Sequence, residues 1–473
     1  MVSRRAFIGG AASLGALSGC RLFRAPTGLF AGAGAKLTLG IVSDIHVDCG
    51  RGDFRKFGDA SQFERTLRWF DAQGVDGVIV AGDLADNGMV NQLECVAEAW
   101  FRVFPSGRSA RDGRPVEQLF VYGNHDYEGH GYDHFSDRYF DRDSFCAGRI
   151  SEDPKGVWES LFHEEYAPIW HKRVKGYSIV GAHWKFGEHS WHGIPAVEDW
   201  FAANGKSLDP ALPFFFVQHP HPKGTVYGDD AWSPDRGFAT RALTPFPNAV
   251  AFSGHSHDSL TDERSIWQGA FTSVATASLR YGGRVDKYEQ RQGLLMRVYD
   301  DHLTLVRRDF LHDASLGDDW VVPLPAAEPK PFSFPARAAK STPPAFAPGA
   351  RLAVRELVRK ESAGTAKDEA RGADAAEREI RCWEVTIPCA NAGVTRAFRY
   401  ELATGLAGPD GKEVKFLRYD AKYNMPLSRA GAETKYLVKE TEFAPAPVGA
   451  ALKPVFTVVP LDSFGNRGEA IGT

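Results

Sequence analysis

The stretch Gln118–Asp126, with the sequence QLFVYGNHD, constrains this chain more than any other. The apolar run from Leu119 to Tyr122 is typical of a buried strand, and it ends at a glycine followed by an amide, an imidazole and a carboxylate. In α/β proteins, ligands bind outside the carboxyl ends of the strands. The stretch therefore predicts a strand whose end carries binding or catalytic chemistry.

Four other apolar runs end in side chains that are typical metal ligands. Leu37–Ser43 leads into Asp44 and His46, Gly77–Ala81 into Asp83, Phe214–Gln218 into His219, and Ala249–Ser253 into His255 and His257. Because the loops at the carboxyl ends of neighbouring strands lie together, we expect these residues to form one site. A lone histidine or aspartate at a strand end is more often a surface or turn residue, but five such ends in one chain are a strong signal.

Amphipathic segments separate the first three runs. Phe63, Leu67 and Phe70 recur on one helical face, with Asp59 as the expected cap, and Leu93, Val96, Ala97, Trp100 and Phe101 mark a second helix. This alternation of strand and helix predicts a layered α/β domain. Further strands are expected at Tyr177–Ala182, Phe271–Ser278, Leu294–Tyr299 and His302–Arg308, the last two joined by a tight turn at Asp300-Asp301.

The segment from Tyr127 to Leu212 shows weak periodicity and many aromatic and histidine side chains. Two interpretations stay open. Long irregular insertions are often lids or binding loops, and the aromatic residues are equally compatible with the core of a peripheral subdomain.

The C-terminal part of the chain has a different pattern. The proline- and alanine-rich stretch Val322–Pro348 predicts a stiff linker over 323–350. Short strands separated by turn residues then predict a fibronectin- or immunoglobulin-like β-sandwich over 351–473. The expected strands are Trp383–Ile387, Thr395–Glu401, Lys415–Tyr419 and Val455–Val459, whereas the charged run Arg355–Arg381 is expected to be a solvated loop.

Length and composition set outer limits. A chain of 473 residues is too long for one core and predicts two or three domains. Hydrophobic residues make up 43% and charged residues 25%, which is typical of a globular protein that is not integral to a membrane. The net charge of -4 gives no reason to expect nucleic acid as a partner. The six cysteines form no CxxC pair, which argues against a structural zinc site or a disulfide framework.

The first residues predict an export signal over 1–20. Ser3–Ile8 resembles a twin-arginine signal, and the apolar run from Ile8 to Leu17 is too short to span a bilayer. Leu17-Ser18-Gly19-Cys20 resembles a bacterial lipobox, in which Cys20 would be lipidated; cleavage after Ala33-Gly34-Ala35 is the alternative. Residues 21–35 then form a tether. The expected location is the periplasm, free or membrane-anchored.

Taken together, the motifs from Asp44 to His257 resemble the calcineurin-like metallophosphoesterase family, and the resemblance covers Lys36 to Val322. It implies a four-layer α/β/β/α catalytic domain over 36–322 with a binuclear metal centre. The family pattern assigns Asp44, His46 and His257 to one ion, Asn124, His219 and His255 to a second, and Asp83 to both. His221 is the nearest rival of His219 and is expected to line the pocket.

The resemblance also implies catalytic roles. His125 would contact the phosphoryl oxygens or protonate the leaving group, and Asp126 would orient its ring. In an extended chain alternate residues share a side; Asp44 and His46 would then grip one ion together, and His125 would point away from an ion held by Asn124. Arg280 is a candidate phosphate contact, with Tyr281 beside it, although a surface salt bridge is the alternative for Arg280. Cys49 either approaches the site or is a small buried residue.

The residues after Asp83 lack the tyrosine ligand of purple acid phosphatases, so the ligand set suits two divalent ions of Mn, Fe or Zn. The resulting hypothesis is an exported phosphoesterase that hydrolyses a small phosphate mono- or diester by attack of a metal-bridging hydroxide. One alternative is a cyclic-nucleotide or other phosphodiesterase. Another is a non-catalytic protein on the same fold that binds glycans or envelope components.

Overall fold

The computed structural model describes residues 34–48, 60–127, 148–184, 194–282, 288–362, 377–390, 397–408, 413–421, 434–442 and 453–473. The predicted leader with Cys20, and also Cys49 and Asp59, lie outside these residues. The chain divides into two units, Met1–Gly34 and Ala35–Thr473, and every helix and strand given below belongs to the second. None of the described helices is long and apolar enough to cross a membrane.

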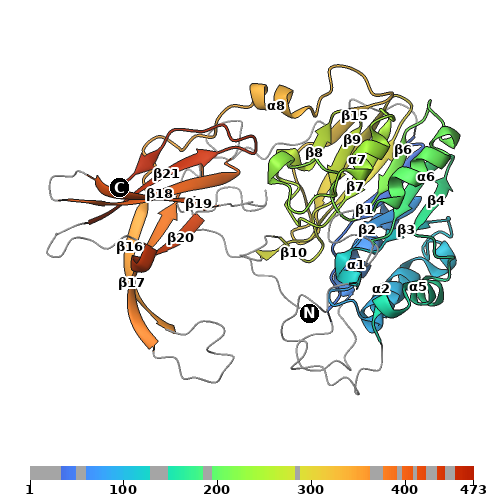
Figure 1. Cartoon of the computed structure of the whole chain (residues 1–473), viewed down its shortest axis with the longest axis horizontal. Coiled ribbons are helices and arrows are strands. Elements are labelled where there is room, and N and C mark those ends of the chain that lie inside the picture. The colour runs from blue at the N-terminus through green and yellow to red at the C-terminus, as the bar shows by residue number, and fades with distance from the viewer. Residues whose placement is uncertain are drawn as a thin grey trace, which may run out of the picture. The chain divides into compact units, whose positions relative to one another are not determined.

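The first central sheet contains the three strands that the sequence predicts before Asp44, Asp83 and Asn124 (Figure 1). Its order is β14-β13-β12-β1-β2-β3, and β15 also pairs with β13. The strands are β1 (Leu37–Val42), β2 (Gly77–Ala81), β3 (Glu117–Val121), β12 (Gln292–Val298), β13 (His302–Asp309), β14 (Ala314–Ser315) and β15 (Trp320–Pro323). β1, β2 and β3 are parallel, so their carboxyl ends lie at one edge. The turn predicted at Asp300-Asp301 is confirmed, because Val298 on β12 pairs with Leu303 on β13.

The second central sheet has the order β4-β5-β6-β7-β9-β8. Its strands are β4 (Ile169–Val174), β5 (Tyr177–Ala182), β6 (Phe214–Val217), β7 (Ala249–Ser253), β8 (Ile266–Gln268) and β9 (Thr272–Ala275). β5, β6, β7 and β9 are parallel neighbours. This sheet therefore also places the ends of two predicted strands, β6 and β7, side by side.

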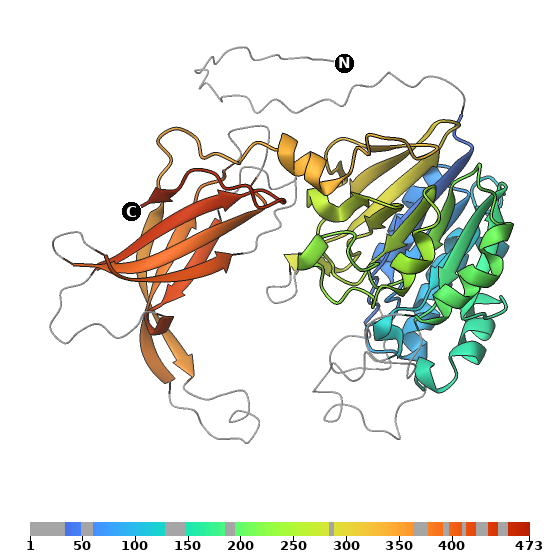
Figure 2. The same ribbon diagram turned by 45° about the horizontal axis from the view of Figure 1, so that its top comes forward.

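Alternating side chains join the two sheets into layers, whose strands can be followed in Figure 2. Ile79 and Leu119 of the first sheet share one hydrophobic cluster with Phe215 and Phe252 of the second, so the sheets pack face to face. The opposite face of the first sheet, with Phe120, packs against α1 (Ser61–Ala72), α2 (Val90–Val103) and α5 (Pro154–Phe162). The opposite face of the second sheet packs against α6 (Ala196–Asn204) and α7 (Phe238–Leu243). The predicted four-layer α/β/β/α architecture is confirmed.

Short elements complete this part of the chain. β10 (Tyr281–Gly282) and β11 (Tyr288–Glu289) form a two-stranded sheet. The 3-10 helices are η1 (Pro105–Gly107), η2 (Ile150–Glu152), η3 (Gly205–Ser207), η4 (Gly228–Asp230), η5 (Glu263–Ser265) and, nearer the C-terminus, η7 (Glu440–Glu442).

The weakly periodic segment from Tyr127 to Leu212 is integrated into the layers wherever the structure describes it. It supplies α5, β4, β5 and α6, and Trp158, Trp170 and Trp184 are buried. These residues support the interpretation of the aromatic side chains as core. His130, His134, His189, Trp191 and His192 lie outside the described residues.

The C-terminal region contains two further sheets, with orders β16-β17-β20 and β19-β18-β21-β22. The strands are β16 (Ala353–Ser362), β17 (Glu377–Ile387), β18 (Arg399–Ala407), β19 (Glu413–Ala421), β20 (Thr434–Lys439), β21 (Lys453–Leu461) and β22 (Ile471–Gly472). Trp383 and Val438 from the first sheet share a hydrophobic cluster with Leu402 and Phe456 from the second. The all-β character predicted here is confirmed.

The loop predicted for the charged run Arg355–Arg381 is wrong in its described parts. The run begins within β16 and ends within β17, and these strands pair in continuous register from Ala353↔Thr386 to Ser362↔Glu377. The charges alternate so that opposite signs meet across the ladder, with a guanidinium–carboxylate distance of 3.1 Å for Arg355–Glu384 and 2.8 Å for Arg381–Glu356. Such cross-strand pairs stabilise a solvated two-stranded ladder.

The predicted linker is partly packed against its neighbours. Leu324 and Phe332 are buried in the cluster between the two central sheets. The backbone of Phe332 also exchanges hydrogen bonds with Gln268, at 3.1 Å each. A short helix, α8 (Phe334–Lys340), follows. The proline content thus correctly indicated a segment without long strands. The apolar residues in the first part of this segment, however, pack it against the layered domain.

Candidate metal centre

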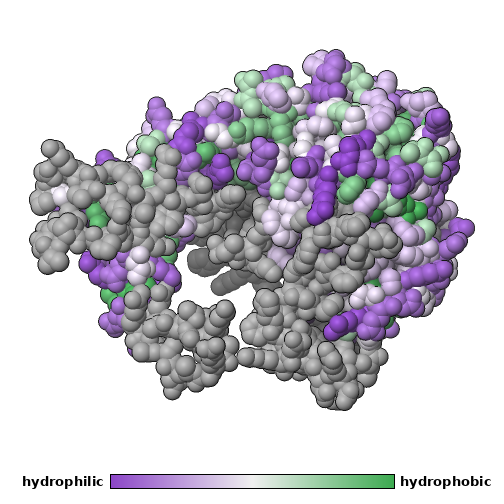
Figure 3. Space-filling model, in the orientation of Figure 1, coloured by the Kyte–Doolittle hydropathy of each residue, from purple (hydrophilic) through white to green (hydrophobic). Residues whose placement is uncertain are grey.

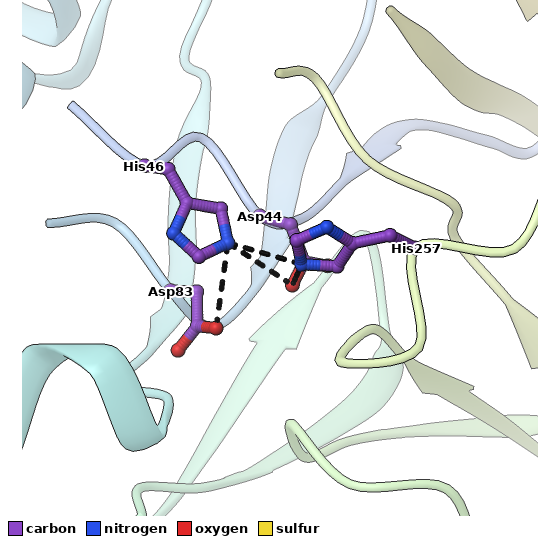
Figure 4. Close-up of side chains that lie close together, drawn as sticks. All are labelled: Asp44, His46, Asp83 and His257. Atoms are coloured by element: carbon purple, nitrogen blue, oxygen red, sulfur yellow. Dashed lines mark hydrogen bonds and ion pairs between the residues drawn. The ribbon is translucent and has the colours of Figure 1, made fainter. Parts of the chain in front are cut away.

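The ends of β1, β2 and β7 bring together Asp44, His46, Asp83 and His257 (Figure 4). The Nε2 atom of His257 lies 2.9 Å from Asp44 Oδ1, and the Nε2 atom of His46 lies 3.6 Å from Asp83 Oδ2. One donor atom from each residue falls within 4.8 Å of all the others. Two carboxylates and two imidazoles therefore converge on one point, although the first and the last of them, Asp44 and His257, are more than 200 positions apart in the chain.

A second group of ligand-type side chains adjoins the first. It consists of Asp83, His219 and His255. His219 Nε2 lies 3.1 Å from Asp83 Oδ2 and 3.1 Å from His255 Nδ1. His219 Nδ1 faces the carbonyl oxygen of Ala81 at 2.8 Å, which fixes the orientation of the ring. Asp83 is common to both groups, as expected of a carboxylate that bridges two ions.

The backbone at these residues is not extended, in contrast to the expectation for Asp44 and His46. Left-handed φ angles occur at five ligand-type residues: Asp44 (53°), His46 (46°), Asp83 (52°), His255 (75°) and His257 (55°). This conformation is unfavourable for residues with a Cβ atom and concentrates at functional sites. Asp44 and His46 do point toward one another. The cause is the sharp turn of the chain after β1, and not the alternation of side chains along a strand.

Two glycines permit the close approach of the loops. A Cβ atom on Gly82, whose φ angle is +90°, would collide with the ring of His219. A Cβ atom on Gly123 would collide with the carboxylate and the backbone nitrogen of Asp83. The glycine that ends each strand is thus required by packing around the ligand-type side chains.

The electrostatics of the site fit bound cations. Asp44 and Asp83 are buried, and in the described residues their ion pairs are with histidines and not with lysine or arginine. Burial alone would raise the pKa of Asp44, but His257 and His46 hold it well below its usual range. Buried ionised carboxylates need a compensating positive charge.

The pKa values of the histidines also indicate that the buried carboxylates need positive charge beside them. Burial opposes protonation, but hydrogen bonds to Asp44 and Asp86 raise the pKa of His46 to about 10. Asp83 in turn raises the pKa of His219 to about 9 against the effect of burial. The buried carboxylates thus draw protons onto rings whose nitrogen atoms are suitable for coordination. Divalent cations would take over this role with the same oxygen and nitrogen donors.

Asn124 and His125 begin a helical turn that extends to Tyr127, so this stretch is not extended as expected. Asn124 is buried. The backbone N–H of His125 donates to Asp83 Oδ1 at 2.9 Å, and its ring lies edge-on to the ring of His46 with centroids 4.6 Å apart. The Nδ1 atom of His125 lies 2.7 Å from the carbonyl oxygen of Asp86. His125 is therefore next to both groups and is anchored by Asp86.

The role predicted for Asp126 is wrong. Its carboxylate accepts backbone N–H groups from Gly123 at 2.7 Å and Ala85 at 2.7 Å. Burial raises its pKa to about 7. Asp126 thus ties the loop after β3 to the loop after β2, and the contact that orients the ring of His125 comes from Asp86.

Asp86 was missed by the sequence reasoning. Its Oδ1 lies 3.0 Å from His46 Nδ1, and the residue forms a third group of possible ligands with His46 and His125. A carboxylate on the outer nitrogen of a ligating histidine fixes the tautomer of the ring. The available signal was its position three residues after Asp83 in the same loop.

The remaining candidates are placed as follows. His221 is fully buried between Ser253 and Ser256, whose Oγ atoms lie 2.8 and 2.9 Å from its ring nitrogens. The guanidinium of Arg280 donates to the carbonyl oxygen of His46 at 2.6 Å and lies 3.3 Å from a carboxylate oxygen of Asp48. Arg280 thus braces the loop after β1, which agrees with the salt-bridge alternative.

The four layers and the two ligand groups that share Asp83 define an α/β/β/α domain with a candidate site for two metal ions. Residues 37–259 match the sequence model of the family described as calcineurin-like phosphoesterase. This part of the chain, a little under half of its length, therefore carries the sequence pattern of a calcineurin-like phosphoesterase domain. It acts on phosphate ester bonds, and the predictions of a phosphoesterase and of two metal ions are confirmed at this level. The choice among Mn, Fe and Zn stays a prediction.

Solved structures of low sequence identity resemble the chain. A dimetal phosphatase from Danio rerio is 10% identical, and the match covers 61% of this chain and 99% of that chain with a TM-score of 0.37. Purple acid phosphatase PPD1 from yellow lupin is 14% identical over 60% of this chain and 53% of that chain, with a TM-score of 0.39. GAP50, described as the anchor in the inner membrane complex of Plasmodium, is 11% identical over 64% and 93%, with a TM-score of 0.35. No curated protein matches the chain.

Proposed function

We propose that the protein is an exported metal-dependent phosphoesterase that hydrolyses a small phosphate mono- or diester. The observation that carries this proposal is the pair of ligand groups that share Asp83 at the carboxyl ends of neighbouring strands. An anionic phosphate binds where the net charge is positive. With only two or three carboxylates in the buried site, two bound divalent ions would supply that positive charge.

The proposed ligands follow from the two groups. Asp44, His46 and His257 would hold one ion and His219 and His255 the other, with Asp83 common to both groups. Asn124, which is also buried, would complete the second set, as the family pattern implies. When bound, the two ions supply a nucleophile derived from water and neutralise charge on the phosphate. Hydrogen bonds to the other ring nitrogen of a ligating histidine, such as the bond from His219 Nδ1 to the carbonyl oxygen of Ala81, keep the ring in position for coordination.

His125 is the proposed catalytic residue of the chain. Its backbone donates to Asp83, and its ring is fixed at Nδ1 by the carbonyl oxygen of Asp86. Because a carbonyl oxygen can only accept, Nδ1–H donates this hydrogen bond, and Nε2 is the nitrogen left to contact the phosphoryl oxygens or the leaving group. Burial lowers the pKa of His125 against the opposing charge of Asp83, so the imidazolium that donates from Nε2 is a stronger acid than a free histidine and is less populated at neutral pH.

Two alternatives differ from this proposal in class. A cyclic-nucleotide or other phosphodiesterase would use the same site with a diester substrate. A non-catalytic protein that binds glycans or envelope components would need neither metals nor turnover. The grouping of every predicted aspartate and histidine ligand at one place favours an enzyme.

The test combines metal analysis with a substrate screen. Purified protein should contain close to two equivalents of metal after loading with Mn²⁺, Fe²⁺ or Zn²⁺, and it should hydrolyse p-nitrophenyl phosphate or bis-p-nitrophenyl phosphate. The ratio of the two rates separates monoesterase from diesterase. His163, an exposed residue at the end of α5, provides a control variant, His163→Asn, that should keep both metals. Metal-loaded protein without activity on either ester or on a broader panel would favour the binding protein.

Export and membrane attachment are proposed from the sequence of the leader. Arg4 and Arg5 precede the apolar run, and Cys20 directly follows it. In a bacterial host, replacing both arginines by lysine should retain the protein in the cytoplasm. Cys20→Ser should release exported protein from the membrane fraction. Export that is independent of both arginines would contradict the twin-arginine assignment.

A further inference from the structure

Trp232 lies flat against one of the ligand-type histidines. Its ring and the ring of His255 are 4.6 Å apart between centroids and inclined by only 25°. On the inner side, Trp184 is also nearly parallel to His255, at 6.4 Å and 29°. The stack fixes the plane of Trp232 relative to the second ligand group.

The two tryptophans differ sharply in exposure. Trp184 is buried, with 3% of its surface exposed, whereas Trp232 is 40% exposed. Within the described ranges, Trp232 is the only aromatic residue among the exposed large hydrophobic side chains. The exposed indole of Trp232 and its stack on His255 together place an aromatic surface beside the metal centre. A planar ligand can stack on such a surface.

The charges near Trp232 indicate what kind of ligand fits. Asp229 and Asp230 precede it on an exposed turn, and Asp230 is paired with Arg264 at 2.6 Å. On the other side of the centre, Arg280 is engaged by the carbonyl oxygen of His46 and by Asp48. Arg264 and Arg280 are thus both engaged within the chain and are not offered to a second phosphate group, which favours an uncharged ring beside a single phosphate.

We propose that Trp232 is a specificity-determining residue that stacks on a planar aromatic ring in the group esterified to the phosphate. The inference rests on the proposed function, because it places the phosphate at the metal centre. If His255 holds an ion at about 2 Å, a phosphate on that ion would lie beside the indole that stacks on His255. An aryl ester carries its ring directly on the phosphate oxygen, and a nucleotide carries it one sugar away. Both present the same planar face.

Three variants test the proposal in metal-loaded, full-length protein. Trp232→Ala removes the stacking surface, and Trp232→Phe keeps a smaller aromatic ring. Trp200→Ala is the control, because Trp200 lies on α6 with its ring against Phe201 and His171. The substrates are p-nitrophenyl phosphate, a nucleoside monophosphate and glycerol phosphate, or the corresponding methyl diesters if the wild type cleaves only diesters. Metal content is measured for each variant.

We expect Trp232→Ala to raise KM for the ring-bearing esters by about 5- to 100-fold, the range typical of lost base stacking. KM for glycerol phosphate, kcat and metal content should stay unchanged, and Trp232→Phe should recover most of the loss. A loss confined to one ring-bearing ester identifies which source of the ring the site prefers. An equal loss for glycerol phosphate, or loss of metal, would overturn the proposal and make Trp232 a support for His255.

Binding provides a readout that does not depend on turnover. Calorimetry of nucleoside monophosphate against inorganic phosphate should show tighter binding of the nucleotide to the wild type, and Trp232→Ala should abolish the difference. Absence of activity on every ester would contradict the proposed function, while a lost nucleotide preference would still support the stacking role. Equal affinities of the wild type for the two ligands, with equal KM for the three esters, would refute it.

Discussion

His183 offers a quantitative test of how the aromatic core beside the metal centre is built. Its Nδ1 atom accepts the backbone N–H of Tyr122 at 3.1 Å, so the neutral ring carries its proton on Nε2. The ring packs edge-on against Trp158, with centroids 4.5 Å apart, and lies tilted against Tyr166, with centroids 4.8 Å apart. Burial, and to a smaller extent the charge of Lys172, lowers the pKa of His183 from 6.5 to about 3.

This shift predicts a specific pH dependence of stability. The unfolded chain binds a proton on this histidine below pH 6.5 and the folded chain does not, so the contribution of His183 is complete above pH 6.5 and is lost as the pH falls toward 3. From the linkage relation, the loss between pH 7.5 and 5.5 is about 1.4 kcal/mol. The figure is insensitive to the folded pKa, because at pH 5.5 only the unfolded state binds the proton.

The assay is urea unfolding of metal-free protein at pH 7.5 and 5.5. His183→Gln keeps an acceptor for Tyr122 but cannot be protonated, so its free energy of unfolding should fall by about 1.4 kcal/mol less than that of the wild type over this interval. His163→Asn is the matched control, because His163 is exposed in a left-handed conformation that asparagine tolerates. Parallel curves for His183→Gln and the wild type would refute the reasoning, since the folded state would then bind the proton.

Four further predictions concern the centre and its boundaries. Asp83→Asn should lower kcat/KM by more than about 100-fold and reduce metal content, because it alters the residue common to both groups; near-normal rates with two metals would exclude a bridging role. His125→Gln should keep both metals but lower kcat by ~10²–10⁴-fold for an alkyl ester and less for a nitrophenyl ester; loss of metal would make it a ligand. Gly123→Ala should weaken metal binding, measured by calorimetry, because the new methyl group displaces Asp83; unaltered affinity would contradict the close approach. A chain that ends at Ser341 should bind metal and hydrolyse ester. A chain that ends at Val322 should be less stable by roughly 2–5 kcal/mol, because it loses buried apolar residues of the linker. Thermal unfolding of the two chains measures this difference in stability.

The central strands of the two large sheets could be predicted well because they are buried on both faces. Continuous apolar runs such as Gly77–Ala81 and Ala249–Ser253 coincide with β2 and β7, and each is bounded by a glycine or a polar residue. The edges of these runs also identified the ligand-type residues. The strand β4 (Ile169–Val174) was not predicted, because only Trp170 and Val174 are buried in it and its other residues are polar or partly exposed.

Charge and backbone conformation limited the remaining predictions. The strands β16 and β17 carry charges that meet across the ladder, and a single sequence does not show which residues will face each other. The left-handed turns at Asp83 and His257 are equally invisible, because local preference disfavours them. Such turns persist only where the surrounding structure fixes them, here through buried ion pairs between carboxylates and histidines.

The exchange of roles between Asp126 and Asp86 shows why sequence adjacency misled. In a helical turn successive side chains diverge by about 100°, so the carboxylate of Asp126 points away from the ring of His125 and toward the backbone of the neighbouring loop. β2 and β3 are parallel and end in register at Ala81↔Val121, which places the loops that follow them side by side. The backbone carbonyl of Asp86 reaches the ring of His125 because of this register, although the two residues are 39 positions apart. Partners of a catalytic residue in such a sheet are therefore better sought in the loop after the neighbouring parallel strand than in the adjacent residue.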